Sequence, residues 1–315
     1  MTVDAPLTWV VGAGGLLGSH VITALSRRAR LWTPGCSVPW GTADAPRLLA
    51  RLAADFADAV GEGPWQVSWC AGAGVTGTTA AALAAESAAF EAWSRALTER
   101  LGDRAEAGAG FVASSAGAVY AGSRSAPFDE ASVVRPISDY GHAKLAVEAA
   151  AARLSEAGIP VVVGRVANLY GPGQDLAKAQ GLVSQICRAH LLARPLTVYV
   201  PLDTVRDYLF AADAGALVAD CLERVRRERG HRTKIIASHQ PVTVGHLVAE
   251  VRRVVKRRPR VTFGAHPNAT LQARDLRVRS IVWPDLDRRP ITPLAVGIAR
   301  TVQAQTGALA AGALA

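Results

Sequence analysis

The stretch that decides the fold is TWVVGAGGLLG, residues 8–18. A short apolar run enters a glycine-rich turn, and an Ala- and Leu-rich segment with helical spacing continues to about Arg28. This order is typical of the opening of a βαβ unit. Gly12 permits the tight turn, Gly15 lets the backbone approach a pyrophosphate, and Gly18 lets the helix pack on the strand. The stretch therefore predicts a phosphate-binding turn at a helix N-terminus.

The remainder of the first half alternates between strand and helix patterns. We expect strands at 29–32, 66–70, 110–114 and 160–164, and helices at 48–59, 80–101 and 140–157. After residue 168 the pattern loosens into helices at 182–192, 213–229 and 244–255 and strands at 196–200 and 234–237. Alternation of this kind predicts an α/β fold with a doubly wound parallel sheet. We expect a dinucleotide-binding domain over 1–168 and a smaller C-terminal α/β substrate lobe over 169–315, interleaved with late elements of the main sheet.

Composition excludes several classes of protein. Of 315 residues, 50% are hydrophobic and 19% are charged, which is enough for a sizeable core and unlike a disordered or collagen-like chain. The four cysteines lack C-x-x-C spacing and the histidines are scattered, so we expect no metal and no disulfide scaffold. The sequence suggests neither a targeting segment nor a membrane span. A reducing, cytoplasmic location fits best.

The chain is basic, with a formal net charge of +9 and an isoelectric point of about 9.9. The charge is concentrated in residues 224–234 and 252–260. Such a balance is compatible with a nucleic acid partner or with an anionic small molecule. The basic segments lack the interleaved aromatic residues of a single-strand binding platform, so we expect a solvated basic surface and no nucleic acid partner.

The end of the second strand lacks a common feature of dinucleotide-binding folds. An acidic residue there usually holds the ribose 2′-hydroxyl. Here residues 31–35 read LWTPG, and the first acid is Asp44. Two interpretations remain open. Either Thr33 and the backbone hold the ribose of NAD, or a 2′-phosphate is accepted with Arg27, Arg28 or Arg30 near it. We slightly favour the second interpretation, and therefore NADP as the cofactor.

Two further features indicate proton-transfer chemistry. Tyr140 and Lys144, in the sequence YGHAK, stand four residues apart and share one face of a helix. The positive charge of the lysine favours the phenolate, so the tyrosine can exchange a proton near neutral pH. Ser114 and Ser115 lie at the end of a strand, where α/β sheets place their ligands. A serine hydroxyl there can hold the reacting oxygen of a substrate.

Six blocks extend these features along nearly the whole chain, from about Trp9 to Thr301. They are VGAGGLLGSH (11–20), SSAGAVYAG (114–122), RPISDYGHAKLAVE (135–148), GRVANLYGPGQ (164–174), RDYLFAAD (206–213) and RRPITPLAVGIART (288–301). With these blocks in this order, the chain resembles an extended short-chain dehydrogenase/reductase of the NAD-dependent epimerase/dehydratase family, whose members mostly act on nucleotide sugars. The resemblance implies a Rossmann-type fold, NAD or NADP as cofactor, and a homodimer paired through helices 80–101 and 140–157.

The resemblance also implies roles for individual residues. Tyr140 corresponds to the catalytic acid/base, and Lys144 to the partner that also contacts the nicotinamide ribose. Ser115 corresponds to the hydroxyl that positions the sugar oxygen, and Ser114 remains an alternative because the spacing to Tyr120 is about one residue longer than in some members. Substrate contacts are implied for Asn168, Arg206 and Arg274. Cofactor contacts are implied, besides Tyr140 and Lys144, for Gly12, Gly15, Leu17, Gly18, Thr33 and Ala71.

The expected reaction is epimerisation of a nucleotide sugar by hydride transfer, with a keto-sugar reductase as the alternative. Sugar 4,6-dehydration is not expected, because Ala116 and Gly117 stand near where dehydratases carry an Asp-Glu pair. A non-catalytic, NADP-sensing protein of the same fold is the alternative from another class. The intact Ser115, Tyr140 and Lys144 argue against it.

Overall fold

Six parallel strands form the central sheet of the computed structural model, which describes residues 5–178, 180–256, 260–264 and 273–312. The strand order is β10-β5-β4-β3-β1-β2. In chain order the strands are β1 (Leu7–Val11), β2 (Arg30–Trp32), β3 (Trp65–Trp69), β4 (Gly108–Ser115), β5 (Val161–Val166) and β10 (His231–Ile236). β3 and β5 are buried along their whole length, as expected for parallel strands covered on both faces.

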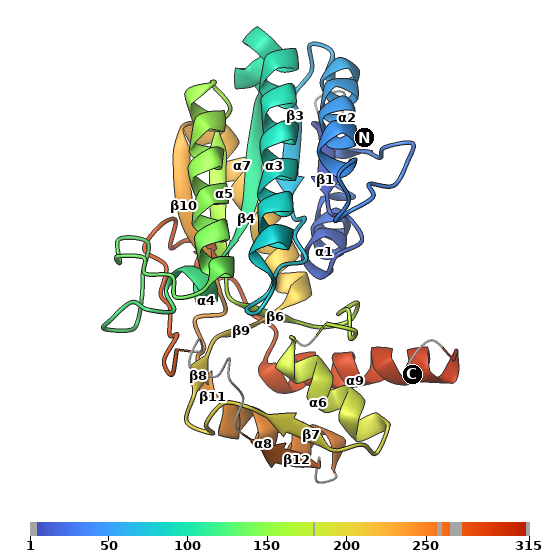
Figure 1. Ribbon diagram of the computed structural model, residues 1–315, viewed down its shortest axis with the longest axis vertical. Coiled ribbons are helices and arrows are strands. Elements are labelled where there is room, and N and C mark those ends of the chain that lie inside the picture. Colours follow the sequence, from blue (N-terminus) through green and yellow to red (C-terminus); the bar gives the residue numbers. More distant parts are fainter. Residues whose placement is uncertain (1–4, 179, 257–259, 265–272, 313–315) are drawn as a thin grey trace.

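Helices cover both faces of this sheet, each over its own apolar core (Figure 1). On one face lie α2 (Ala45–Val60), α3 (Ala80–Leu101) and α5 (Asp139–Glu156). On the other face α1 (Leu16–Leu25) packs against α7 (Ala211–Glu228). The prediction of a doubly wound α/β fold is confirmed. Among the helices described, none combines the length and apolar character needed to cross a bilayer.

β2 forms one edge of the sheet and is only three residues long. From β2 the chain passes through residues 33–44 and α2 directly to β3, on the other side of β1. The sheet therefore reverses its winding between β1 and β3. In open α/β sheets, ligands bind at such a reversal, beyond the carboxyl ends of the strands.

The later part of the chain builds a second, smaller core below the sheet in Figure 1. It contains α6 (Leu182–Leu191), α8 (Val244–Val255) and α9 (Leu294–Ala310), of which α9 was not among the expected helices. Three two-stranded pairs accompany them. They are β6 (Asn168–Tyr170) with β9 (Tyr208–Phe210), β8 (Val205–Arg206) with β11 (Val242–Thr243), and β7 (Leu196–Val198) with β12 (Val261–Phe263). α7 and β10 come from the same part of the sequence, but β10 is a strand of the main sheet and α7 packs on one face of it.

Short elements complete the chain between these. A four-residue helix, α4 (Ala116–Val119), follows β4 directly, and two 3-10 turns cover Gly102–Ala107 and Leu286–Arg288. Ser and Thr side chains cap several helices, because their oxygens accept hydrogen bonds from first-turn N–H groups. Ser138 caps α5 through the N–H of Gly141, and Ser115 caps α4 through that of Ala118. These two caps fix the helix starts that carry the candidate site.

Candidate active site

The glycine turn after β1 is packed too closely for side chains. Gly12 has φ +85, and a Cβ there would lie 2.6 Å from the backbone nitrogen of Ala71, in the loop after β3. A Cβ on Gly18 would lie 2.2 Å from the carbonyl oxygen of Gly12. Gly15 is the N-cap of α1, in an extended conformation and without a side-chain cap. Leu17 buries its side chain in the core, while its N–H belongs to the uncapped first turn. The turn therefore offers backbone donors to an anion and fits a pyrophosphate.

The ribose side of this turn is formed by the end of β2. Thr33 follows the strand and is exposed. Trp32 packs its ring 4.9 Å from that of Trp9 and 5.4 Å from that of Phe56, measured between centroids. Trp32 thus contributes to the core, and Thr33 is left as the side chain at the predicted ribose position.

Two of the three arginines considered for a 2′-phosphate, Arg28 and Arg30, have partners near the amino end of β2. Arg28 pairs with Asp220 of α7 at 2.6 Å. The Nε of Arg30 donates to the carbonyl oxygen of Ala5, which precedes the start of β1. Both side chains therefore have their partners near the amino end of β2. The helix α1 runs back along the sheet after β1, so the residues that follow it lie at the amino end of the parallel strands. Their positions give no support to a preference for NADP.

Tyr140 and Lys144 occupy the first two turns of α5. The Nζ of Lys144 lies 5.6 Å from the centroid of the Tyr140 ring. Gly141 allows α5 to approach α4, since a Cβ there would lie 2.7 Å from the carbonyl oxygen of Ala118. The close approach brings Tyr140 toward the carboxyl end of β4. The structure therefore places the two side chains together at the predicted edge of the sheet.

The two neighbouring serines have different surroundings. Ser114 is buried and donates a hydrogen bond of 2.5 Å to Glu148, which also forms an ion pair of 2.8 Å with Arg165. Ser115 is half-buried, and its Oγ accepts from the N–H of Ala118 at 3.3 Å. Ser114 is thus engaged in a network between β4, β5 and α5. Ser115 is the hydroxyl that faces the start of α4.

Asn168 lies close to α4, the helix that Ser115 caps. It begins β6, and its N–H donates to the carbonyl oxygen of Asp207 at 3.1 Å. A Cβ placed on Gly117 would lie 3.8 Å from the side-chain oxygen of Asn168. Asn168 is therefore adjacent to α4 at Gly117, which lies two residues after Ser115 in the chain.

Arg206 and Arg274 come from neighbouring segments of the substrate side. The N–H of Val205 donates to the carbonyl oxygen of Arg274 at 2.8 Å, so β8 and residues 274–276 run side by side. Arg206 is 7% exposed, and burial lowers the pKa of its guanidinium. Arg274 is exposed and forms an ion pair with Asp203. The structure brings the two segments together and gives the buried environment to Arg206 alone.

One residue at the site was not anticipated from the sequence. Glu86 of α3 accepts hydrogen bonds from the N–H groups of Ala73 at 2.7 Å and Gly74 at 2.8 Å. The only signal for it is that it is the single charged side chain among the small and apolar residues 80–90. The isolated charge predicts that Glu86 has a polar partner, but the sequence does not show which residues supply it.

Comparison with known proteins supports the same assignment. The model of the NAD dependent epimerase/dehydratase family matches residues 8–237. The chain belongs to this family. No match was found among curated proteins.

Solved structures share the epimerase/dehydratase fold over nearly the whole chain. A UDP-glucose 4-epimerase from Thermotoga maritima, with UDP-glucose, is 20% identical with a TM-score of 0.78, covering 96% of this chain and 99% of its own. A UDP-glucose 4-epimerase from Thermus thermophilus, in complex with NAD, is 21% identical with a TM-score of 0.77 and the same coverage. TunA, an NAD-dependent NDP-hexosamine 5,6-dehydratase, is 18% identical with a TM-score of 0.75, covering 95% and 97%.

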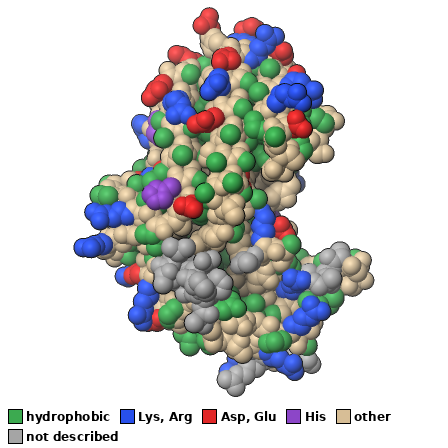
Figure 2. Space-filling model, viewed as in Figure 1, with side chains coloured by type: hydrophobic (Ala, Val, Ile, Leu, Met, Phe, Trp, Pro, Cys, Tyr) green, Lys and Arg blue, Asp and Glu red, His purple; other side chains and the backbone are tan. Residues whose placement is uncertain are grey.

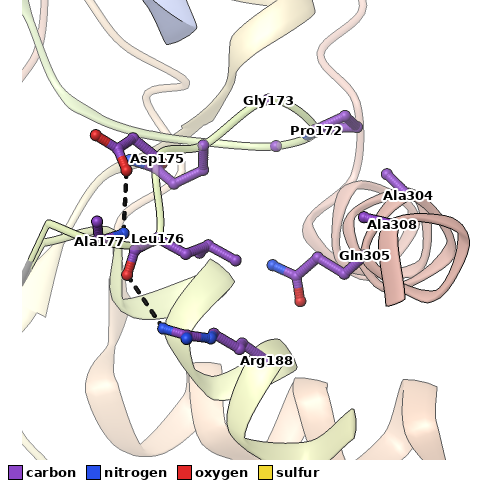
Figure 3. A pocket seen from close by; sticks show the side chains of 11 residues that line it. Pro172, Gly173, Asp175, Leu176, Ala177, Arg188, Ala304, Gln305 and Ala308 are labelled. Carbon is purple, nitrogen blue, oxygen red and sulfur yellow. Dashed lines mark hydrogen bonds between the residues drawn. The ribbon is translucent and has the colours of Figure 1, made fainter. Parts of the chain in front are cut away.

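A cavity of about 410 Å³ lies between residues 171–177 and the helices α6 and α9. Figure 3 shows Arg188 of α6 reaching the loop, where it donates to the carbonyl oxygen of Leu176, and Gln305 of α9 on the far side. None of the predicted site residues lines this cavity. The predicted site residues lie instead at the carboxyl edge of the sheet.

The predictions about metals and nucleic acid concern side chains outside this edge of the sheet. In the described part of the chain, no three His, Cys, Asp or Glu side chains are grouped as metal ligands would be. His266 and residues 257–259 of the second basic segment lie outside the described residues. On the face drawn in Figure 2, Lys and Arg side chains are dispersed among neutral and acidic ones.

Proposed function

We propose that this protein is an NAD(P)-dependent nucleotide-sugar epimerase. The observation that carries the proposal is the meeting of three elements at one edge of the sheet. The glycine turn at Gly12 packs on the loop after β3, and Cβ atoms placed on Gly72 and Gly74 of that loop would lie 3.3 Å from Lys144 and Tyr140. Ser115 and Asn168 adjoin from β4 and β6. This proximity supports a site in which phosphate binding and proton transfer are neighbours.

The cofactor would be held by the backbone of the glycine turn. Gly12 and Gly18 allow the tight packing that forms the turn, and the first-turn N–H groups of α1 suit a pyrophosphate. When bound, NAD(P) supplies a reversible acceptor for hydride.

The side chains of the protein then handle the proton and the orientation of the sugar. Tyr140 as phenolate takes the proton of the reacting hydroxyl while the carbon loses hydride, which leaves a ketone on the sugar. Lys144 stabilises the phenolate, and Ser115 donates a hydrogen bond that orients the oxygen. After the ketone presents its other face, hydride returns and Tyr140 gives the proton back. Both hydrogens are restored, so the reaction is an isomerisation.

The substrate class follows from the buried cation and from the similar structures. Solved relatives of this fold contain UDP-glucose or UDP-glucuronic acid. A largely buried guanidinium such as Arg206 suits a diphosphate, which it can bind in a bidentate manner. We propose a nucleoside diphosphate sugar held by Arg206, Arg274 and Asn168.

The proposal is tested with UDP-glucose and UDP-glucuronic acid, incubated with the protein without added cofactor. We expect NMR to show the epimeric sugar nucleotide, and we expect Tyr140→Phe to lower kcat by at least about 100-fold. Binding of NADH to that variant, followed by fluorescence, should stay close to wild type. Wild-type turnover by Tyr140→Phe contradicts the proposed chemistry. Stoichiometric consumption of NADH or NADPH by a keto sugar would instead identify a reductase.

A further inference from the structure

α3 contributes to the site a carboxylate that the proposed chemistry does not use. Glu86 lies in the second turn of this helix. Its Oε1 accepts both the N–H of Ala73 and the N–H of Gly74, at 2.7 and 2.8 Å. These residues belong to the loop that touches the glycine turn at Ala71. One carboxylate oxygen therefore fixes the conformation of the loop that borders the cofactor side of the site.

The second oxygen of Glu86 faces the two proposed catalytic side chains. A Cβ placed on Gly72 would lie 3.4 Å from Glu86 Oε2 and 3.3 Å from Lys144 Nζ, so these two atoms are no farther apart than the sum of the two distances. A Cβ placed on Gly74 would lie 3.3 Å from the same Oε2 and 3.3 Å from Cδ2 of Tyr140. Only glycine at positions 72 and 74 leaves the space between these groups open.

We propose that Glu86 is a positioning residue, in which one carboxylate oxygen fixes residues 73 and 74 and the charge of the carboxylate orients the Lys144 ammonium beside Tyr140, across a separation longer than an ion pair. The inference rests on the proposed function, in which Tyr140 exchanges the proton. Its physical basis is attraction between opposite charges at a half-buried site, where screening by water is incomplete. Because α3 and α5 pack side by side in Figure 1, the two charges come from neighbouring helices.

The charge of Glu86 has a second consequence. A carboxylate near Lys144 offsets part of the electrostatic effect of the ammonium on Tyr140, so removing the charge of the carboxylate should strengthen that effect. Other ionisable groups on the surrounding elements are paired, neutral or exposed. Glu148 pairs with Arg165, Glu91 with Arg153 and Asp58 with Arg100, burial raises the pKa of the Cys70 thiol to about 12, and Asp139 and His142 are exposed.

The test uses Glu86→Gln, which keeps an oxygen to accept both N–H groups and removes the charge. Tyr140 is titrated by tyrosinate absorbance, as the difference between each protein and the same protein carrying Tyr140→Phe. We expect the titration midpoint to fall in Glu86→Gln. Glu91→Gln, on an exposed position of the same helix, is the matched control and should leave the midpoint at its wild-type value.

A wild-type midpoint in Glu86→Gln overturns the inference, since a purely structural role in the loop needs no charge. Glu86→Ala removes both hydrogen bonds as well, and we expect its Kd for NADH to rise about tenfold. Should the alanine variant fail to fold, as judged by circular dichroism, the glutamine variant still decides. The midpoint does not depend on turnover, so turnover retained by Tyr140→Phe would count against the proposed function and not against the placement of Glu86.

Discussion

At the scale of single residues, two adjacent serines have opposite tasks. Successive side chains of a strand point to opposite faces, so Ser114 and Ser115 cannot share one environment. Ser114 is bonded to Glu148 in the core, and Ser115 faces α4 and the candidate site. Stability should therefore depend on Ser114 and turnover on Ser115.

Replacing each serine by alanine separates these tasks. We expect Ser114→Ala to lower the free energy of unfolding by about 1–2 kcal/mol, because the buried Glu148 loses a hydrogen-bond donor, with kcat/KM nearly unchanged. Ser115→Ala should lower kcat/KM by about tenfold or more with little change in stability. Urea unfolding and steady-state kinetics on both variants check this. The reverse pattern would make Ser114 the substrate hydroxyl.

At the scale of elements, a buried ion pair ties β10 to the 3-10 turn Leu286–Arg288. The Nζ of Lys234 is fully buried and lies 2.8 Å from Asp287. Burial alone would raise the pKa of the Asp287 carboxyl, but the hydrogen bonds and charges of His239 and Lys234 outweigh it and lower that pKa below 3.8. A lowered pKa means that the contribution to stability is present above the unfolded value and lost as pH falls toward the folded value.

Asp287→Asn should therefore destabilise the protein by about 3 kcal/mol at neutral pH, because Lys234 keeps its charge without a buried counter-charge. The difference from wild type should shrink as pH falls below 3.8, where the wild-type carboxyl also loses its charge. Urea unfolding at several pH values measures both effects. Asp285→Asn, at a half-exposed ion pair with Arg224, is the control and should cost less than about 1 kcal/mol. A cost for Asp287→Asn that is independent of pH would contradict this account.

At the scale of the whole molecule, α3 and α5 present an exposed surface of small side chains beside the site. The exposed residues of these helices include Ala84, Ala88, Ala146 and Ala149. In Figure 2, hydrophobic side chains, coloured green, are spread over the face that α3 and α5 form. Small side chains let helices of two subunits approach closely. We propose that the protein pairs through these helices, as the family resemblance implies.

Light scattering should then give twice the chain mass of 32.9 kDa. Ala149→Arg should shift the protein toward the monomer, because an arginine on each subunit would separate the helices. Ala310→Arg, at an exposed position of α9, is the matched control and should leave the mass unchanged. A monomeric wild-type protein at micromolar concentration would contradict the pairing.

The sequence predicted what depends on local rules and missed what depends on packing. The glycine turn, the strand and helix periodicity and the i, i+4 pair of Tyr140 and Lys144 are local, and the structure contains them. The partners of Arg28 and Arg30 could not be read from the sequence, because Asp220 lies 192 residues away and Ala5 lies 25 residues away. Glu86 was missed because its partners, 12 and 13 residues away, meet it only after α3 packs on the loop.

The most direct test of the central claim is to denature freshly purified protein and identify the released nucleotide by mass spectrometry. The account predicts about one NAD(P) per chain from wild type and from Tyr140→Phe, and little from Gly12→Ala, whose Cβ would collide with the backbone of Ala71. Gly14→Ala, with open space around its Cβ, should release as much as wild type. Absence of NAD and NADP from wild type, together with no binding of NADH or NADPH in titration, would contradict the account.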